Sequence, residues 1–108
     1  MFTNFLLTYS VRAQTSASSD KEKADSVRDE IADLDVWTKL ETVETTFAGK
    51  MYVTGLSVSD KKKKAVANVE EVFLPILKKH SAHSYDVQIT CALLTGNIEQ
   101  PFEFVVKN

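Results

Sequence analysis

The sequence predicts an α+β fold in which two amphipathic helices cover one face of a mainly antiparallel sheet. Several segments alternate apolar and polar residues with a period of two, which is typical of strands. Two other segments space their apolar residues by three and four, which is typical of helices. The chain of 108 residues is 44% hydrophobic and 26% charged, the composition of a globular protein. We therefore expect a single domain over residues 1–108.

The first predicted element is a strand from Phe5 to Arg12. One set of alternating residues forms its apolar face: Phe5, Leu7, Tyr9 and Val11. The polar stretch 13–19 follows and is expected to connect this strand to a helix. Ser18 or Ser19 is the expected helix cap, because Glu22 stands three residues after Ser19 as in a capping box.

A narrow apolar stripe predicts the first helix, which begins at Asp20. The stripe consists of Ala24, Val27, Ile31 and Leu34. Asp33 and Asp35 would lie at the negative end of the helix dipole, so we expect the helix to stop close to Leu34.

The stretch from Val36 to Leu56 is rich in Thr, Val and aromatic residues, which favour strands. We predict two strands here, Trp37–Thr45 and Phe47–Leu56, with Ala48-Gly49-Lys50 as a candidate turn. Trp37 is either a core residue or an interface anchor.

A second helix is predicted to begin near Ser59 or Asp60. Its apolar stripe fits a period of 3.6 residues: Ala65, Val66, Val69, Val72, Phe73, Ile76 and Leu77. Pro75 cannot donate to the carbonyl of Glu71, so it should kink the helix or end it near Leu74.

Two more strands complete the chain, Val87–Leu94 and Phe102–Val106, and Pro101 suits the start of an edge strand. The element order is that of a ferredoxin-like βαββαβ sandwich with an extra C-terminal strand. The two helices must share one face of the sheet. The other face carries residues that are too apolar for water, Leu6, Thr8, Thr90, Ala92 and Leu94. We therefore expect this face or a neighbouring edge to form a homodimer.

A run of cations, Lys61 to Lys64, is the most unusual local feature. It occupies the first turn of the second helix, where the dipole disfavours cations. The run either binds phosphate or a nucleic-acid backbone, or it is a solvated face. The candidate anion or nucleic-acid site consists of Arg12, Lys61, Lys62, Lys63, Lys64, Lys78 and Lys79. The net charge of −2 argues against a generally basic surface.

The remaining reactive side chains predict no catalytic set, no metal site and no cofactor. His80 and His83 are two ligands where a zinc site needs three or four, so a surface loop is expected. Cys91 shares a strand face with apolar residues and should be buried and inert. As the single Cys it also excludes an intrachain disulfide and points to a reducing compartment. No Gly-x-Ser-x-Gly elbow surrounds Ser10.

Two segments, Phe5 to Ser10 and Trp37 to Thr46, carry a resemblance to a known family. An apolar strand ending in Tyr9, then a helix, then a Trp-bearing Thr-rich strand resembles the small ferredoxin-like ribonucleases of CRISPR adaptation and their VapD-type toxin relatives. The resemblance implies a dimer of bacterial, phage or plasmid origin. Active members carry a metal-binding Asp directly after the first-strand Tyr, where this chain has Ser10. A hydroxyl does not replace a carboxylate as a hard-metal ligand, so the resemblance implies binding rather than cleavage.

The leading functional prediction is a non-enzymatic, homodimeric interaction or regulatory module. The alternative is a nucleic-acid-binding protein or metal-dependent nuclease-like protein that uses the Lys-rich helix N-terminus. A third candidate is a sensor that holds a small molecule in a dimer cleft. No apolar run approaches the roughly 20 residues that span a bilayer, so we expect a cytoplasmic protein without a membrane partner.

Overall fold

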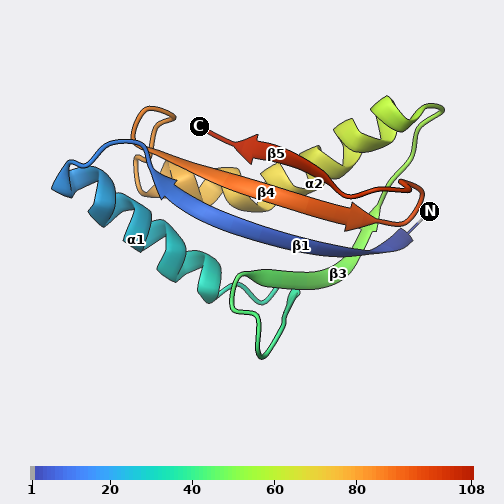
Figure 1. Ribbon diagram of the computed structural model, residues 1–108, viewed down its shortest axis with the longest axis horizontal. Coiled ribbons are helices and arrows are strands. Elements are labelled where there is room, and N and C mark those ends of the chain that lie inside the picture. Colours follow the sequence, from blue (N-terminus) through green and yellow to red (C-terminus); the bar gives the residue numbers. More distant parts are fainter. Residues whose placement is uncertain (1) are drawn as a thin grey trace.

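A computed structural model describes residues 2–108 and places them in five strands and two helices (Figure 1). In chain order the elements are β1 Phe2–Ala13, α1 Ser18–Ala32, β2 Thr38–Lys39, β3 Thr46–Tyr52, α2 Val58–Lys79, β4 Val87–Thr95 and β5 Phe102–Val106. The predicted order of strands and helices and the α+β class are confirmed.

The five strands form one sheet in the order β2-β3-β1-β4-β5, and every neighbouring pair is antiparallel. The long strand β1 lies in the middle and pairs with both β3 and β4. In this register Leu7 stands between Phe47 of β3 and Leu93 of β4. Because facing residues point to the same side, the apolar alternation of three strands makes one continuous surface.

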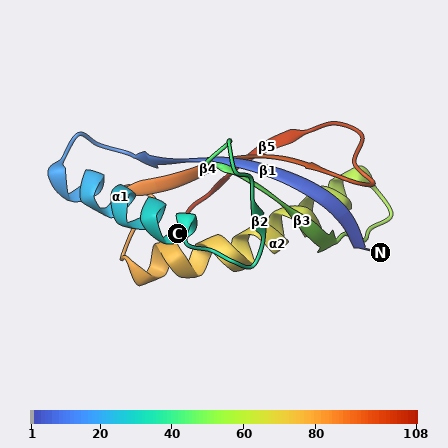
Figure 2. The same ribbon diagram turned by 90° about the horizontal axis from the view of Figure 1, so that it is seen from below.

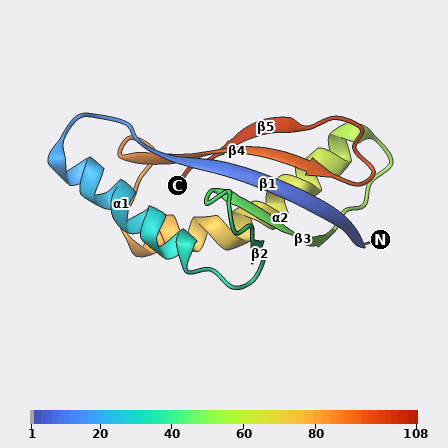
Figure 3. The same cartoon turned by 60° about the horizontal axis from the view of Figure 1, so that its bottom comes forward.

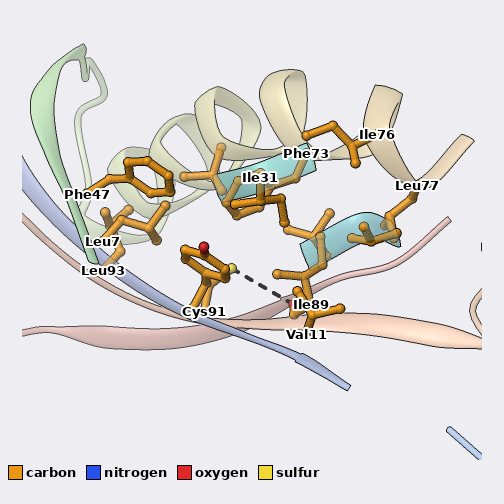
Figure 4. Packing of buried hydrophobic residues seen from close by; sticks show 14 of the residues in the cluster. Leu7, Val11, Ile31, Phe47, Phe73, Ile76, Leu77, Ile89, Cys91 and Leu93 are labelled. Carbon is orange, nitrogen blue, oxygen red and sulfur yellow. Dashed lines mark hydrogen bonds between the residues drawn. The ribbon is translucent and has the colours of Figure 1, made fainter. Parts of the chain in front are cut away.

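Both helices cover the same face of this sheet (Figure 2). Val27 and Ile31 of α1 and Phe73 and Leu77 of α2 have no exposed surface. They meet the apolar side of β1, β3 and β4, where side chains from the two layers interdigitate (Figure 4). Since each helix buries one stripe against one side of the sheet, the opposite side is left without a covering layer.

The start of α1 differs from the predicted cap. The helix begins at Ser18, its N-cap residue is Ala17, and no side chain caps it. The capping box of Ser19 and Glu22 is therefore wrong. Asp20 instead turns inward, is buried, and accepts a hydrogen bond from the Thr15 hydroxyl.

The turn between the two strands after α1 is not where the sequence predicted it. β2 is only two residues long, and the chain turns within 40–45 rather than at Ala48-Gly49-Lys50. Gly49 lies inside β3 opposite Phe5, and a Cβ there would approach the Phe5 ring to 2.9 Å. The glycine therefore serves close packing of an aromatic ring, which a turn signal in the sequence does not distinguish.

α2 continues through Pro75 to Lys79, so the predicted end near Leu74 is wrong. Ile76 and Leu77, one and two positions beyond the proline, are buried in the core. Their burial stabilises the last turn and offsets the single backbone hydrogen bond that Pro75 cannot make.

Trp37 is partly buried and packs against the core. Its ring packs edge-on against Phe5, Phe47 and Phe73, with centroids 5.4 to 5.6 Å apart. These contacts tie the segment after α1 to both layers of the domain. At the far side of the sheet β5 is an edge strand directly after Pro101, as predicted. Within residues 2–108, neither helix combines the length and apolarity needed to cross a bilayer.

Candidate functional site

The side of the sheet that faces away from the helices is the candidate functional site, and we call it the open face. Leu6 of β1 lies directly opposite Leu94 of β4, and each side chain is 44% exposed. Ala48 of β3 lies opposite Leu6 on its other side, and Ala92 is two residues from Leu94 on the same side of β4. Apolar side chains of β3, β1 and β4 therefore meet at the centre of the open face.

A hollow of about 490 Å³ lies over this apolar centre. It is lined by Leu6, Thr8, Leu40, Val43, Thr46, Ala92, Leu93, Leu94 and Pro101. Leu40 and Val43 come from the loop between β2 and β3, which rises past the sheet on the side opposite the helices (Figure 2). The open face is thus a shallow apolar trough with the β2–β3 loop at one rim and Pro101 at the other.

Backbone hydrogen bonds hold that loop in place. The Leu40 N–H donates to the Thr46 carbonyl (3.0 Å), and the Thr46 N–H donates to the Val43 carbonyl (3.1 Å). The Thr45 carbonyl accepts from the Tyr9 N–H at 3.0 Å and from the Thr8 hydroxyl at 3.2 Å. These bonds fix the rim against the central strand, so the trough is preformed.

Polar residues occupy the half of the open face beyond the trough. Ser10, Arg12, Thr90 and Glu103 share a second hollow of about 340 Å³. Ser10 of β1 lies directly opposite Thr90 of β4. Glu103 is the carboxylate of this hollow, and Arg12 is its cation.

The four lysines 61–64 lie in the first turns of α2, as predicted. The Ser57 Oγ caps this helix by accepting from the Asp60 N–H at 3.1 Å. Lys62 Nζ lies 5.4 Å from the centre of the Phe102 ring, a cation–π contact between α2 and β5. A hollow of about 670 Å³ between these two elements is lined by Lys62, Lys63, Val66, Phe102 and Phe104, among others.

Lys78 and Lys79 lie at the opposite end of α2. With a rise of about 1.5 Å per residue, they are about 24 Å from Lys62 along the helix axis. Lys79 Nζ is 3.0 Å and His80 Nε2 is 2.9 Å from the same Glu30 carboxylate oxygen. The Lys79 hydrogen bond, helped by His80, lowers the pKa of Glu30. These side chains join the two helices, so Lys79 has a structural partner on α1.

The seven cations of the candidate site therefore occupy three separate places. Arg12 is on the open face, the lysines 61–64 are at the start of α2, and Lys78 and Lys79 are at its end. The structure therefore does not bring the seven cations into one site.

The other reactive side chains take structural positions. Cys91 is buried on the helix side of β4, and burial raises the pKa of its thiol to about 12. His83 stacks on Tyr85, with ring centroids 5.4 Å apart. Among residues 2–108, no group of three or more His, Cys, Asp or Glu side chains is arranged to hold a metal ion.

Two features of the open face were not predicted from the sequence. The first is the rim formed by Leu40 and Val43, which sequence reasoning assigned to a strand. The second is an exposed aromatic pair at one end, Phe2 and Tyr52, whose ring centroids lie 5.3 Å apart. Strand alternation indicates that each of these two residues points to the open face. That they lie opposite each other follows only from the register of β1 and β3.

Comparison of this chain with protein-family models, with curated proteins and with solved structures finds no match. The geometry of the open face is therefore the basis for proposing a function.

Proposed function

We propose that this protein is a non-enzymatic, homodimeric interaction module and that a second copy of the chain covers its open face. The observation that carries the proposal is the opposed pair of half-exposed leucines, Leu6 and Leu94, at the bottom of a preformed apolar trough. Contiguous apolar surface of this kind favours a protein interface. A second copy offers the same apolar centre, as a two-fold interface requires.

The size of the open face suits a dimer of moderate affinity. Strands lie about 4.8 Å apart and rise about 3.4 Å per residue, so the spacings from β2 to β5, taken over the nine-residue length of β4, span on the order of 600 Å². Two such faces would bury about 1,200 Å² together, near the lower limit for specific interfaces. We therefore expect dissociation in the micromolar range, with the two sheets about 10 Å apart.

The fold supports a dimeric module of ferredoxin-like type. β3 lies between β1 and β2, so the first strand–helix–strand unit is split by an inserted strand, and β4 returns to the other side of β1. We propose that the domain is a ferredoxin-like βαββαβ sandwich to which β5 adds an edge strand. The ribonuclease and toxin families that the sequence resembles are dimers, which agrees with this proposal.

Size-exclusion chromatography with light scattering tests the proposal. The chain has a mass of 12.1 kDa, and we expect the measured mass to rise towards twice that value as concentration increases through tens of micromolar. A mass that stays at the single-chain value over this range would refute the dimer.

A further inference from the structure

An exposed aromatic pair lies at the end of the open face, outside the apolar trough. Phe2 of β1 and Tyr52 of β3 are opposite each other in the register, and their rings meet edge to face with centroids 5.3 Å apart. Their side chains are 70% and 51% exposed. Exposed aromatic rings on adjacent strands offer a ring face on which a base can stack, and we call this pair the Phe2–Tyr52 platform.

A lysine lies on the same side of the sheet as the aromatic pair. Lys50 is two residues before Tyr52, so it projects from the same side of β3, and it stands opposite Asn4 of β1. The Asn68 side-chain amide donates to the Tyr52 carbonyl at 3.2 Å and to the Lys64 carbonyl at 2.8 Å. This shared donor joins the second turn of α2 to the end of β3 on the helix side of the sheet, whereas the first turn of α2 lies nearer β5 (Figure 3).

We infer that this end of the protein binds single-stranded nucleic acid, with a base stacked on the Phe2–Tyr52 platform. Base stacking on exposed aromatic side chains and attraction of phosphates to nearby cations are the two parts of single-strand binding. Lys50 shares the side of the sheet that carries the aromatic pair and is placed to contact a phosphate next to the stacked base. Duplex nucleic acid does not fit, because its bases are stacked inside the helix and cannot reach the rings.

The platform can act independently of the proposed dimer. Neither Phe2 nor Tyr52 lines the trough around Leu6 and Leu94. The site also excludes part of the sequence-based cation set, because Arg12, Lys78 and Lys79 lie towards the other end of the molecule (Figure 1). The single-stranded ligand would therefore contact one end of the domain over a few nucleotides.

Fluorescence anisotropy with labelled 12-nucleotide oligo(dT) and oligo(U) tests this inference. We expect salt-sensitive binding of one or both strands, a loss of at least fivefold on Tyr52→Ala or Phe2→Ala, and retention of affinity in Tyr52→Phe. Tyr85→Ala is the matched control, since Tyr85 is 70% exposed, as Phe2 is, but lies two residues before β4. Lys50→Gln should lower the salt slope by about one, whereas Lys21→Gln on α1 should leave it unchanged.

Three results would contradict single-strand binding at the Phe2–Tyr52 platform. Absence of binding to both oligonucleotides at 50 mM salt would refute it. So would binding that Tyr52→Ala and Phe2→Ala leave unchanged, or a 12-base-pair duplex that binds as tightly as the single strand. Circular dichroism of each variant shows whether the fold is intact, and the exposed positions predict that it is.

Discussion

Leu6 and Leu94 lie directly opposite each other on β1 and β4, on the side of the sheet that no helix covers, and each is 44% exposed. Their strand neighbours Leu7 and Leu93 point the other way and have no exposed surface. The same two strands therefore present leucines on both faces, of which only one is buried within the chain. Covering the second face would remove more apolar surface from water.

A charge placed at the centre of the open face should strongly weaken the proposed dimer. In Leu94→Glu a carboxylate would have to be buried between two apolar sheets without a partner, which is strongly unfavourable. We expect a dissociation constant at least 100-fold higher, measured by sedimentation equilibrium. The thermal midpoint of the monomer should change little, because the side chain is half-exposed in the single chain.

Leu56→Glu is the matched control for this substitution. Leu56 lies between β3 and α2 and is fully exposed, away from the trough. Leu56→Glu makes the same chemical change outside the proposed interface. We therefore expect it to leave the proposed dimer intact. Equal effects of the two substitutions would contradict the assignment of the interface to the open face.

Phe73→Ala should cost about 3 to 5 kcal/mol of unfolding free energy, the usual range for a buried Phe. Phe73 has no exposed surface and contacts Tyr9 and Trp37 at ring-centroid distances of 5.8 and 5.6 Å. Urea denaturation followed by Trp37 fluorescence measures the loss. Phe102→Ala, at a half-buried edge position, should cost clearly less. A smaller loss for Phe73 than for Phe102 would contradict the described core.

Cys91 should not react with a disulfide reagent such as DTNB while the protein is folded. The thiol is 1% exposed, and burial raises its pKa to about 12, so the thiolate is scarce at pH 8. One thiol per chain should react after addition of guanidinium chloride. Rapid reaction of the native protein at pH 8 would show that β4 is more open than described.

Glu30 should make the stability of the domain depend on pH in the acid range. Its contacts with Lys79 and His80 lower its pKa below the usual value of 4.5. Its stabilising effect is therefore present above that value and is lost as the pH falls through the lower pKa of the folded protein. Because Lys79 is largely exposed, the effect should be less than about 1 kcal/mol.

Glu30→Gln should accordingly lower the unfolding free energy at pH 7 and have less effect at pH 3. Urea denaturation at both values measures the difference. Glu22→Gln, an exposed position on the same helix, is the control and should change neither. A larger effect of Glu30→Gln at pH 3 than at pH 7 would have the wrong sign for this ion pair.

Periodicity was sufficient to predict the two layers of the fold. The stripes of Val27 and Ile31 and of Val69 and Phe73 lie buried against the same side of the sheet, as the spacing indicated. The predictions that failed relied on residue types that usually mark turns or helix ends, whereas these residues are placed by contacts with distant parts of the chain. Gly49 was interpreted as a turn residue but makes room for a ring. Pro75 was expected to kink the second helix or end it near Leu74, and the helix continues to Lys79 with Leu77 buried.

The sequence predicted only part of the candidate site. Alternation identified Leu6, Ala92 and Leu94 as residues of an uncovered face, because a period of two needs no tertiary information. The rim at Val43 depends on how a loop folds over the sheet, and the Phe2–Tyr52 pair depends on strand register. Neither is encoded in spacing along the chain.

Isotope-filtered nuclear Overhauser measurements on a mixed sample of ¹³C-labelled and unlabelled chains test the central claim most directly. We predict contacts between the methyl groups of Leu6, Leu94 and Val43 in one copy and apolar side chains of the same face in the other. Intermolecular contacts confined to the helices or to the β5 edge, or none at concentrations where light scattering reports a dimer, would contradict it.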